Sequence, residues 1–291
     1  MAIDELKLLY GVLAGLRQNS TVAVGPGDDC AVLLFPGGGF DLLAAVDQLV
    51  RDVHYTADTP PEAAGAKLMK RNLSDIAAMG GRPLWALMTV AANGRSTEWL
   101  ERFCLGAAKC GEKYGVPVVG GDLASLPPST EVGTLTILGD VPQGRAVLRS
   151  GAKPGEAVYV TGEIGNSFDS GHHLDFVPRL AEGEFLRGRA GAMLDISDGL
   201  LLDASRIARA SRVDLVIDSA RVPLRAGAVL PQALSDGEDY ELLFTAPPGL
   251  ETSWPEELTP ITRIGKVVPG AGAVRNIDGE EYSNGKLGYE H

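Results

Sequence analysis

The sequence lacks the features that mark membrane, nucleic-acid-binding and disulfide-rich secreted proteins. No run of about 18 apolar residues is present, so no membrane-spanning helix is expected. Basic residues are outnumbered, 26 lysines and arginines against 38 aspartates and glutamates, which argues against nucleic acid or an anionic membrane as a partner. Three cysteines occur in 291 residues, without CxxC spacing, and they indicate reduced thiols and a cytoplasmic location.

Several common catalytic motifs are missing as well. The absence of GxxxxGK[ST] excludes a P-loop NTPase, and no protein-kinase motif set or GxSxG nucleophile elbow occurs. The loop GPGDDCAV at residues 25–32 lacks the last glycine of a GxGxxG loop and places Asp28 and Asp29 where a pyrophosphate would lie. The doublet His172-His173 could bind a metal ion or belong to an ordinary loop. We favour the ordinary loop, because the side chains of adjacent residues point in different directions.

The chain alternates between strand and helix patterns. Apolar runs of strand length occur at residues 40–47, 84–91, 116–119, 132–141, 157–161, 192–196, 213–218 and 241–246. Helical patterns occur at residues 60–79, 97–114 and 199–211. This order predicts an α/β (α+β) protein.

The ends of these patterns predict boundaries. Thr97 is the expected N-cap of the helix at residues 97–114. Residues 1–18 predict an amphipathic helix of a soluble protein rather than a signal peptide, because acidic residues stand where a signal peptide is basic. A basic Pro-Gly turn from residue 149 predicts two domains, residues 1–148 and 149–291.

Aspartates gather where apolar runs end or helices begin. They are Asp28, Asp29, Asp47, Asp122, Asp195 and Asp198, with Asp75 inside the helix at residues 60–79. Like charges 4 Å apart repel by about 4 kcal/mol at an effective dielectric constant near 20. A divalent cation removes this repulsion, and Mg²⁺ fits best because it binds carboxylates together with substrate phosphates.

An alternative interpretation gives each aspartate a structural role of its own. Asp198 would cap the helix that starts near residue 199, Asp29 would form an Asx-turn, and Asp75 would pair with Arg71 one helical turn away.

Seven segments, taken in order, resemble the motifs of thiamine-monophosphate kinases. They are GPGDDCAVL, AVDQLV, NLSDIAAMGG, VVGGD, GRAVLRSGAKPGE, DISDGL and GEDYELLFT, and the match is collinear over residues 20–291. These kinases belong to the superfamily of aminoimidazole ribonucleotide synthetase, selenophosphate synthetase and HypE. The resemblance implies a two-domain aminoimidazole ribonucleotide synthetase-like fold, with an N-terminal mixed sheet and helices and a C-terminal α/β domain. It also implies a homodimer joined through strands of the N-terminal domain.

The resemblance further implies transfer of the ATP γ-phosphoryl group to thiamine monophosphate, with several Mg²⁺ ions assisting. Carried over position by position, the metal ligands are Asp29, Asp47, Asp75, Asp122, Asp195 and Asp198. The residues implied to contact ATP are Gly121, Asp122, Arg149 and Ser197. Those implied to contact the thiamine phosphate are His54, Glu238 and Tyr289. No covalent residue or general base is expected, because a phosphate monoester oxygen is already anionic near neutral pH.

Two of the motifs depart from the family pattern. The family usually has Ser-Thr-Asp-Thr where this chain has Ala45-Val46-Asp47-Gln48, and Asp236 replaces the first glycine of GGEDYE. Two alternatives therefore stay open: a related superfamily enzyme that uses ATP on another small acceptor, and a catalytically weak nucleotide-binding homologue.

Overall fold

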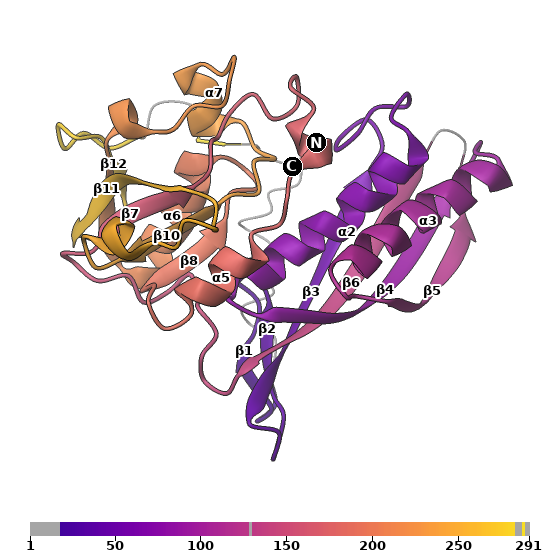
Figure 1. Ribbon diagram of the computed structural model, residues 1–291, viewed down its shortest axis with the longest axis horizontal. Helices are drawn as coiled ribbons and strands as arrows, with labels where there is room; N and C mark the ends of the chain where they lie inside the picture. Colours follow the sequence, from indigo (N-terminus) through magenta and orange to yellow (C-terminus); the bar gives the residue numbers. More distant parts are fainter. Residues whose placement is uncertain (1–17, 128–129, 283–286, 289–291) are drawn as a thin grey trace.

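The computed structural model describes residues 18–127, 130–282 and 287–288. Within them, the strands form two six-stranded sheets, which Figure 1 shows beside each other, the N-terminal one in indigo to magenta and the C-terminal one in pink to yellow. The helix expected at residues 1–18 falls almost wholly outside the described residues, and Tyr289 lies outside them too. Of the helices described, none is both long and apolar enough to cross a membrane.

The N-terminal sheet is mixed, as the resemblance implies. Its strands follow the spatial order β1 (Val22–Val24), β2 (Ala31–Leu34), β3 (Phe40–Val50), β6 (Glu131–Pro142), β4 (Arg82–Ala92) and β5 (Val118–Ser125). The β4–β5 pair is parallel and the other pairs are antiparallel. The fold class, α/β (α+β), is confirmed.

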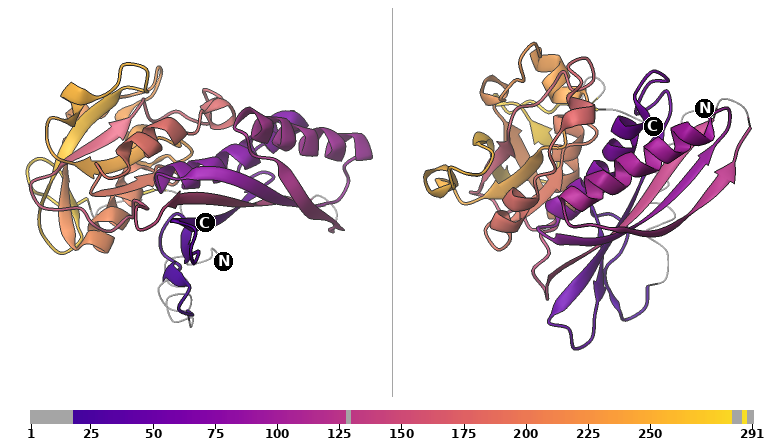
Figure 2. Two further views of the ribbon diagram at one scale, coloured as in Figure 1. Left: turned by 60° about the horizontal axis from the view of Figure 1, so that its bottom comes forward. Right: turned by 45° about the vertical axis from the view of Figure 1, so that its right-hand side comes forward.

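Helices α2 (Pro61–Ala78) and α3 (Thr97–Lys113) cover one face of this sheet (Figure 2). Their backbones approach closely, since a Cβ atom at Gly65 would lie 2.0 Å from the Phe103 carbonyl oxygen. The N-cap of α3 is Ser96, whose Oγ accepts from the Trp99 N–H at 3.1 Å, so the expectation of Thr97 was wrong by one residue. Both residues carry hydroxyls, and the extended backbone at Ser96 selects between them.

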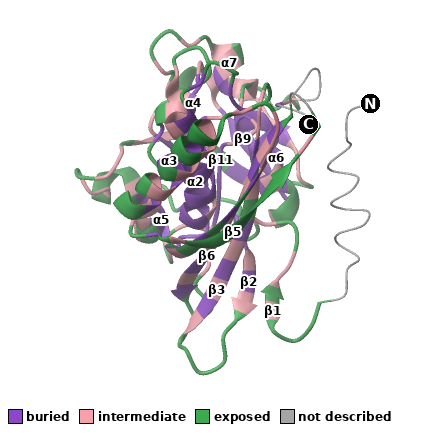
Figure 3. Cartoon of the chain, turned by 90° about the vertical axis from the view of Figure 1, so that its right-hand side faces the viewer, coloured by how far each residue is buried: buried purple, intermediate pink, exposed green. Residues whose placement is uncertain are grey.

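No described helix covers the opposite face of the N-terminal sheet, which we call the open face. Along β3, Leu43, Ala45 and Leu49 are buried toward the helices, whereas Val46 points the other way and is 59% exposed. Trp85 and Leu87 of β4 are exposed on the same open face. Figure 3 shows the exposed edge that β5 forms beside it.

The C-terminal sheet has the order β12 (Val274–Arg275), β9 (Val213–Ile217), β11 (Ile261–Pro269), β7 (Ala157–Thr161), β10 (Leu242–Ala246) and β8 (Ala192–Asp195). Every residue of β7, β8, β9 and β10 is buried, which explains why these strands read as continuous apolar runs. The helices of this half are α4 (His172–Asp175), α5 (Leu180–Leu186), α6 (Leu200–Ser211) and α7 (Leu230–Ser235).

Helix α2 lies at the junction of the two halves. It packs on its own sheet and also contacts β8, α4 and α5 of the C-terminal half. Ser74 of α2 donates a hydrogen bond to Asp195 Oδ2 at the end of β8, at 2.5 Å. Residues from both halves therefore meet along this helix. The domain division at residues 148 and 149 stays a prediction.

Candidate active site

Five of the six predicted metal ligands line one cavity at this junction, which we call the acidic cavity. Its volume is about 310 Å³, and the five are Asp29, Asp47, Asp75, Asp195 and Asp198. They come from the loop before β2, from β3, from α2, from the end of β8 and from the loop before α6. Segments far apart in the sequence thus bring their carboxylates together.

Three of these carboxylates form a compact oxygen cluster. Asp29, Asp75 and Asp195 each offer an oxygen atom within 4.8 Å of the others. Burial, with the charges of Asp47 and Asp195 added, raises the pKa of Asp75 well above its ordinary value. Burial and the charge of Asp29 raise the pKa of Asp195 to about 8. An all-oxygen donor set with this much mutual repulsion fits a hard divalent cation such as Mg²⁺.

Arginines pair with three of the five aspartates, namely Asp29, Asp198 and Asp47. Arg149 forms a two-pronged pair with Asp29, through Nη2 at 2.8 Å and Nε at 3.3 Å. Arg206 Nη2 lies 2.6 Å from Asp198 Oδ2. Arg71 Nε lies 3.2 Å from Asp47 Oδ2.

These pairs overturn the separate structural roles that the sequence allowed. Helix α6 has Gly199 at its N-cap and no side-chain cap, so Asp198 does not cap it. Arg71 pairs with Asp47 rather than with Asp75, because Asp75 turns toward the carboxylate cluster. The Asx-type contact belongs to Asp28, whose Oδ1 accepts from the Asp29 N–H at 3.1 Å.

A second pocket, of about 260 Å³, adjoins the acidic cavity. It contains two of the residues predicted to contact the thiamine phosphate, His54 and Glu238, together with the half-exposed ring of Phe168. Arg71, Ser197 and Asp198 line both cavities. A group bound in one cavity can therefore reach a group bound in the other.

Buried Lys67 contacts two residues that line the second pocket, and it was not identified from the sequence. Its side chain is 0% exposed, and Nζ donates to the His54 carbonyl oxygen at 2.6 Å and to the Glu238 carboxylate. Burial lowers the pKa of Lys67 to about 8. Lys67, Arg71 and Asp75 follow one another at four-residue spacing along one side of α2, and this charged stripe is the signal that would have found Lys67.

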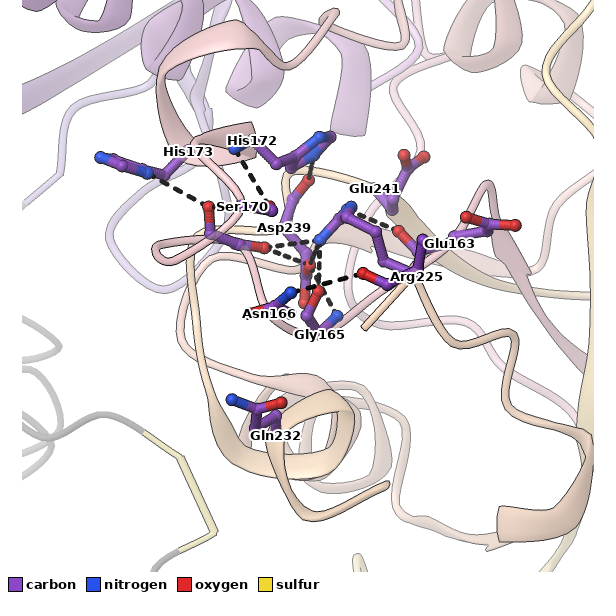
Figure 4. A network of polar contacts seen from close by, with 12 residues as sticks. Glu163, Gly165, Asn166, Ser170, His172, His173, Arg225, Gln232, Asp239 and Glu241 are labelled. Carbon is purple, nitrogen blue, oxygen red and sulfur yellow. Dashed lines mark hydrogen bonds and ion pairs between the residues drawn. The ribbon is translucent and has the colours of Figure 1, made fainter. Parts of the chain in front are cut away.

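A buried polar network fixes the loop that carries Glu238 (Figure 4). Glu238 and Tyr240 have left-handed backbones, with φ of 70° and 51°, which is a strained state for residues other than glycine. Between them, Asp239 accepts hydrogen bonds from the Gly165 N–H at 2.9 Å and from Arg225 Nη1 at 2.8 Å. The network holds the strained loop in place, so Glu238 faces the pocket.

The two adjacent histidines belong to this network rather than to a metal site. His172 Nε2 donates to the Asp239 carbonyl oxygen at 3.0 Å, and His173 Nδ1 lies 3.1 Å from the Ser167 carbonyl oxygen. Burial and the charge of Arg225 lower the pKa of His172 to about 4, so its ring is neutral at physiological pH. The ordinary structural interpretation of this doublet is therefore the better one.

Gly121 and Asp122 are the two predicted site residues that line neither cavity of the described structure. Both lie on the exposed edge strand β5. Asp122 pairs in parallel register with Thr89, whose side chain points to the open face, so its carboxylate is directed to that face as well. Asp122 therefore does not belong to the lining of the acidic cavity in the described chain.

The raised pKa values of the carboxyl groups predict how the stability of the protein depends on pH. In EDTA, the free energy of unfolding is expected to fall between about pH 6 and about pH 8, because folded Asp195 retains a proton that an unfolded aspartate has lost. Mg²⁺ takes the place of that proton, so its stabilising effect is expected to grow over the same range. Thermal melts with EDTA and with MgCl₂ at both pH values measure this, and a shift that does not grow with pH would contradict it.

The chain is similar to known proteins over its whole length. A family model described as AIR synthase related protein, N-terminal domain, matches residues 27–141. Thiamine-monophosphate kinase from Escherichia coli O157:H7 is 35% identical, over 100% of this chain and 99% of that protein. A solved structure of AaThiL complexed with AMPPCP and TMP has a TM-score of 0.84 at 29% identity and covers 99% of both chains. Hydrogenase maturation protein HypE in complex with ATP has a TM-score of 0.70 at 18% identity, over 99% of this chain and 96% of that one, which shows a shared fold alone.

Proposed function

The chain belongs to the thiamine-monophosphate kinase family, and from this membership we propose that it transfers the γ-phosphoryl group of ATP directly to thiamine monophosphate. The observation that carries the proposal is the contact between two cavities of complementary character. One is lined by carboxylates and arginines, the other contains His54, Glu238 and an exposed aromatic ring, and three residues border both. Donor and acceptor phosphates bound there would meet at this border.

ATP is assigned to the acidic cavity, with its phosphates held through Mg²⁺. The ions would be held by Asp29, Asp47, Asp75, Asp195 and Asp198. Bound Mg²⁺ supplies neutralisation of the phosphate charge. Arg149 and Ser197 line the same cavity and would contact the nucleotide directly, although Arg149 must then share its guanidinium with Asp29.

Thiamine monophosphate is assigned to the second pocket. His54 and Glu238 would orient it, and the ring of Phe168, 45% exposed and stacked on His173 at 4.1 Å, offers a flat face to a heterocycle. An oxygen of its phosphate bonds to the γ-phosphorus while the bond to the β,γ-bridging oxygen breaks, and ADP leaves with the electron pair. The attacking oxygen is already anionic, so no general base is required.

We further propose a homodimer formed across the open face. Val46 both lines the acidic cavity and is 59% exposed on that face, which also exposes Trp85 and Leu87. A second copy seated there would cover these apolar side chains. It would also bring Gly121 and Asp122 of the partner subunit to the mouth of the cavity, which supports their predicted roles in binding ATP and metal.

Replacing Leu87 by Asp tests the dimer. A charge placed on the open face would be buried by the second copy, and a desolvated unpaired charge costs several kcal/mol. The variant is therefore expected to be a monomer and to have at least about tenfold lower kinase activity. Light scattering gives the mass, and Leu105→Asp, on exposed α3, is the matched control that should stay dimeric. A monomeric Leu87→Asp protein with full activity would refute the shared site.

A direct product assay tests the function. The full chain is incubated with ATP, Mg²⁺ and thiamine monophosphate, and thiamine diphosphate is quantified by chromatography, with EDTA and with thiamine as comparison reactions. Product that depends on Mg²⁺ and on the acceptor phosphate is the expected result. ATP turnover only with another phosphorylated acceptor would favour a different superfamily activity, and Mg²⁺-dependent ATP binding without turnover would favour a weak nucleotide-binding homologue. The reaction is proposed to occur in the cytoplasm, which the unpaired thiols of Cys30, Cys104 and Cys110 favour.

A further inference from the structure

Arg71 is a buried cation to which the roles proposed above assign nothing. It lies on α2 with 9% of its surface exposed. It lines the acidic cavity and the second pocket alike, and the two other residues that do so are Ser197 and Asp198. Arg71 is therefore the positive charge at the border that the phosphoryl group must cross.

The guanidinium of Arg71 is only partly used. Its Nε lies 3.2 Å from Asp47 Oδ2 on the side of the acidic cavity. Its Nη1 is buried and has no hydrogen-bond partner among the described residues. That atom lies 4.0 Å from Glu238 Oε1, a residue of the second pocket. Buried donors are normally satisfied, so this atom indicates a ligand that supplies an acceptor oxygen.

The neighbouring cations are already engaged. Arg149 contacts Asp29 and the Gly27 carbonyl oxygen, and Arg206 contacts Asp198 and Asp203. Lys67 donates to a carbonyl oxygen and a carboxylate, as described above. Among the cations around the border in the described part of the chain, Arg71 is the one with a buried N–H group left for a ligand.

We propose that Arg71 binds the phosphate of thiamine monophosphate at the border between the two cavities, and holds the same phosphate after it has become part of the diphosphate. This inference rests on the proposed function for the identity of the ligand. A planar guanidinium with one edge on Asp47 can present its other N–H groups to two phosphate oxygens. The acceptor phosphate is then positioned for attack without a metal ion of its own.

Calorimetry in EDTA tests the contact apart from catalysis. Wild-type protein is titrated with thiamine monophosphate and with thiamine, and the ratio of the two dissociation constants reports binding of the phosphate. Arg71→Met is expected to weaken binding of thiamine monophosphate by roughly tenfold to a hundredfold and to leave binding of thiamine unchanged. Arg71→Lys keeps the charge but loses the planar guanidinium, so its affinity for thiamine monophosphate should lie between those of wild type and Arg71→Met.

Kinetics and a matched control separate binding from a structural role. Arg71→Met should raise KM for thiamine monophosphate much more than KM for ATP. Arg82→Met removes the same charge from an exposed arginine paired with Asp140, and it should change neither constant. Thermal melts establish that each variant is folded, and if Arg71→Met does not fold, Arg71→Lys still has to show the altered ratio.

Two results would overturn the inference. One is an Arg71 variant that keeps the wild-type ratio of dissociation constants. The other is a variant whose affinities for thiamine and for thiamine monophosphate fall by the same factor. The product assay is read separately. If wild type makes no thiamine diphosphate but binds thiamine monophosphate through Arg71, the phosphate contact stands and the proposed function fails. If wild type makes product and the ratio does not depend on Arg71, the function stands and the contact fails.

Discussion

Replacing Asp75 by Asn is expected to lower kcat/KM for thiamine diphosphate formation by roughly 10³-fold while making the metal-free protein more stable. Asp75 belongs to the three-carboxylate cluster, and one lost ligand removes several kcal/mol of charge stabilisation in the transition state. In the absence of metal, burial and neighbouring carboxylates raise the pKa of Asp75 well above its ordinary value, so its charge opposes folding. A neutral amide of the same shape removes that opposition.

The two effects of Asp75→Asn are measured on one preparation, by the product assay with Mg²⁺ and by thermal melting in EDTA. The midpoint is expected to rise by about 2–4 °C, as for a gain near 1 kcal/mol in a chain of this size. Asp140→Asn, which affects a carboxylate paired with exposed Arg82, is the control and should leave activity unchanged. A variant that loses stability and activity together would show that Asp75 supports the fold rather than a metal.

Replacing Lys67 by Met is expected to lower the free energy of unfolding by about 3–5 kcal/mol, since it leaves a partly buried carboxylate without its ammonium partner. The His54 carbonyl oxygen loses a donor at the same time. Because both partners border the second pocket, KM for thiamine monophosphate should rise by at least about tenfold. Denaturant unfolding and steady-state kinetics measure the two effects.

A double variant separates charge from shape in this pair. In Lys67→Met with Glu238→Gln, the uncompensated charge is gone, so much of the lost stability should return while KM stays high. A Lys67→Met protein as stable and as active as wild type would contradict the role assigned to this buried pair.

Helices and strands were predicted well from the sequence where their buried residues form a clear apolar pattern. The expected helix at residues 60–79 is α2, Pro61–Ala78, and the expected strand at residues 157–161 is β7 at the same bounds. Strand β11 was missed because it is an internal strand with Arg263 and Lys266 among its apolar residues. Strand β1 has three residues, too few for a period to be recognised.

In the candidate site, too, some residues were predicted from the sequence and others were not. Five aspartates predicted from separate motifs line one cavity, although two loops, one helix and two strands carry them. Lys67 was missed and Arg71 was considered only as a partner of Asp75, since charged residues on a helix normally face water, whereas α2 is buried between two halves of the chain. Asp122 lies on the exposed edge strand β5 and lines neither cavity, so its predicted role depends on the proposed homodimer. What the sequence could not provide is this three-dimensional proximity.

Transfer of label from the γ-phosphorus of ATP is the most direct test of phosphoryl transfer between the two cavities. The full chain is incubated with Mg²⁺, thiamine monophosphate and γ-³²P-labelled ATP, and protein and small molecules are then separated. Label is expected in the terminal phosphate of thiamine diphosphate, and none is expected on the protein. Label retained on the protein, or released only as inorganic phosphate, would contradict direct transfer between the two cavities.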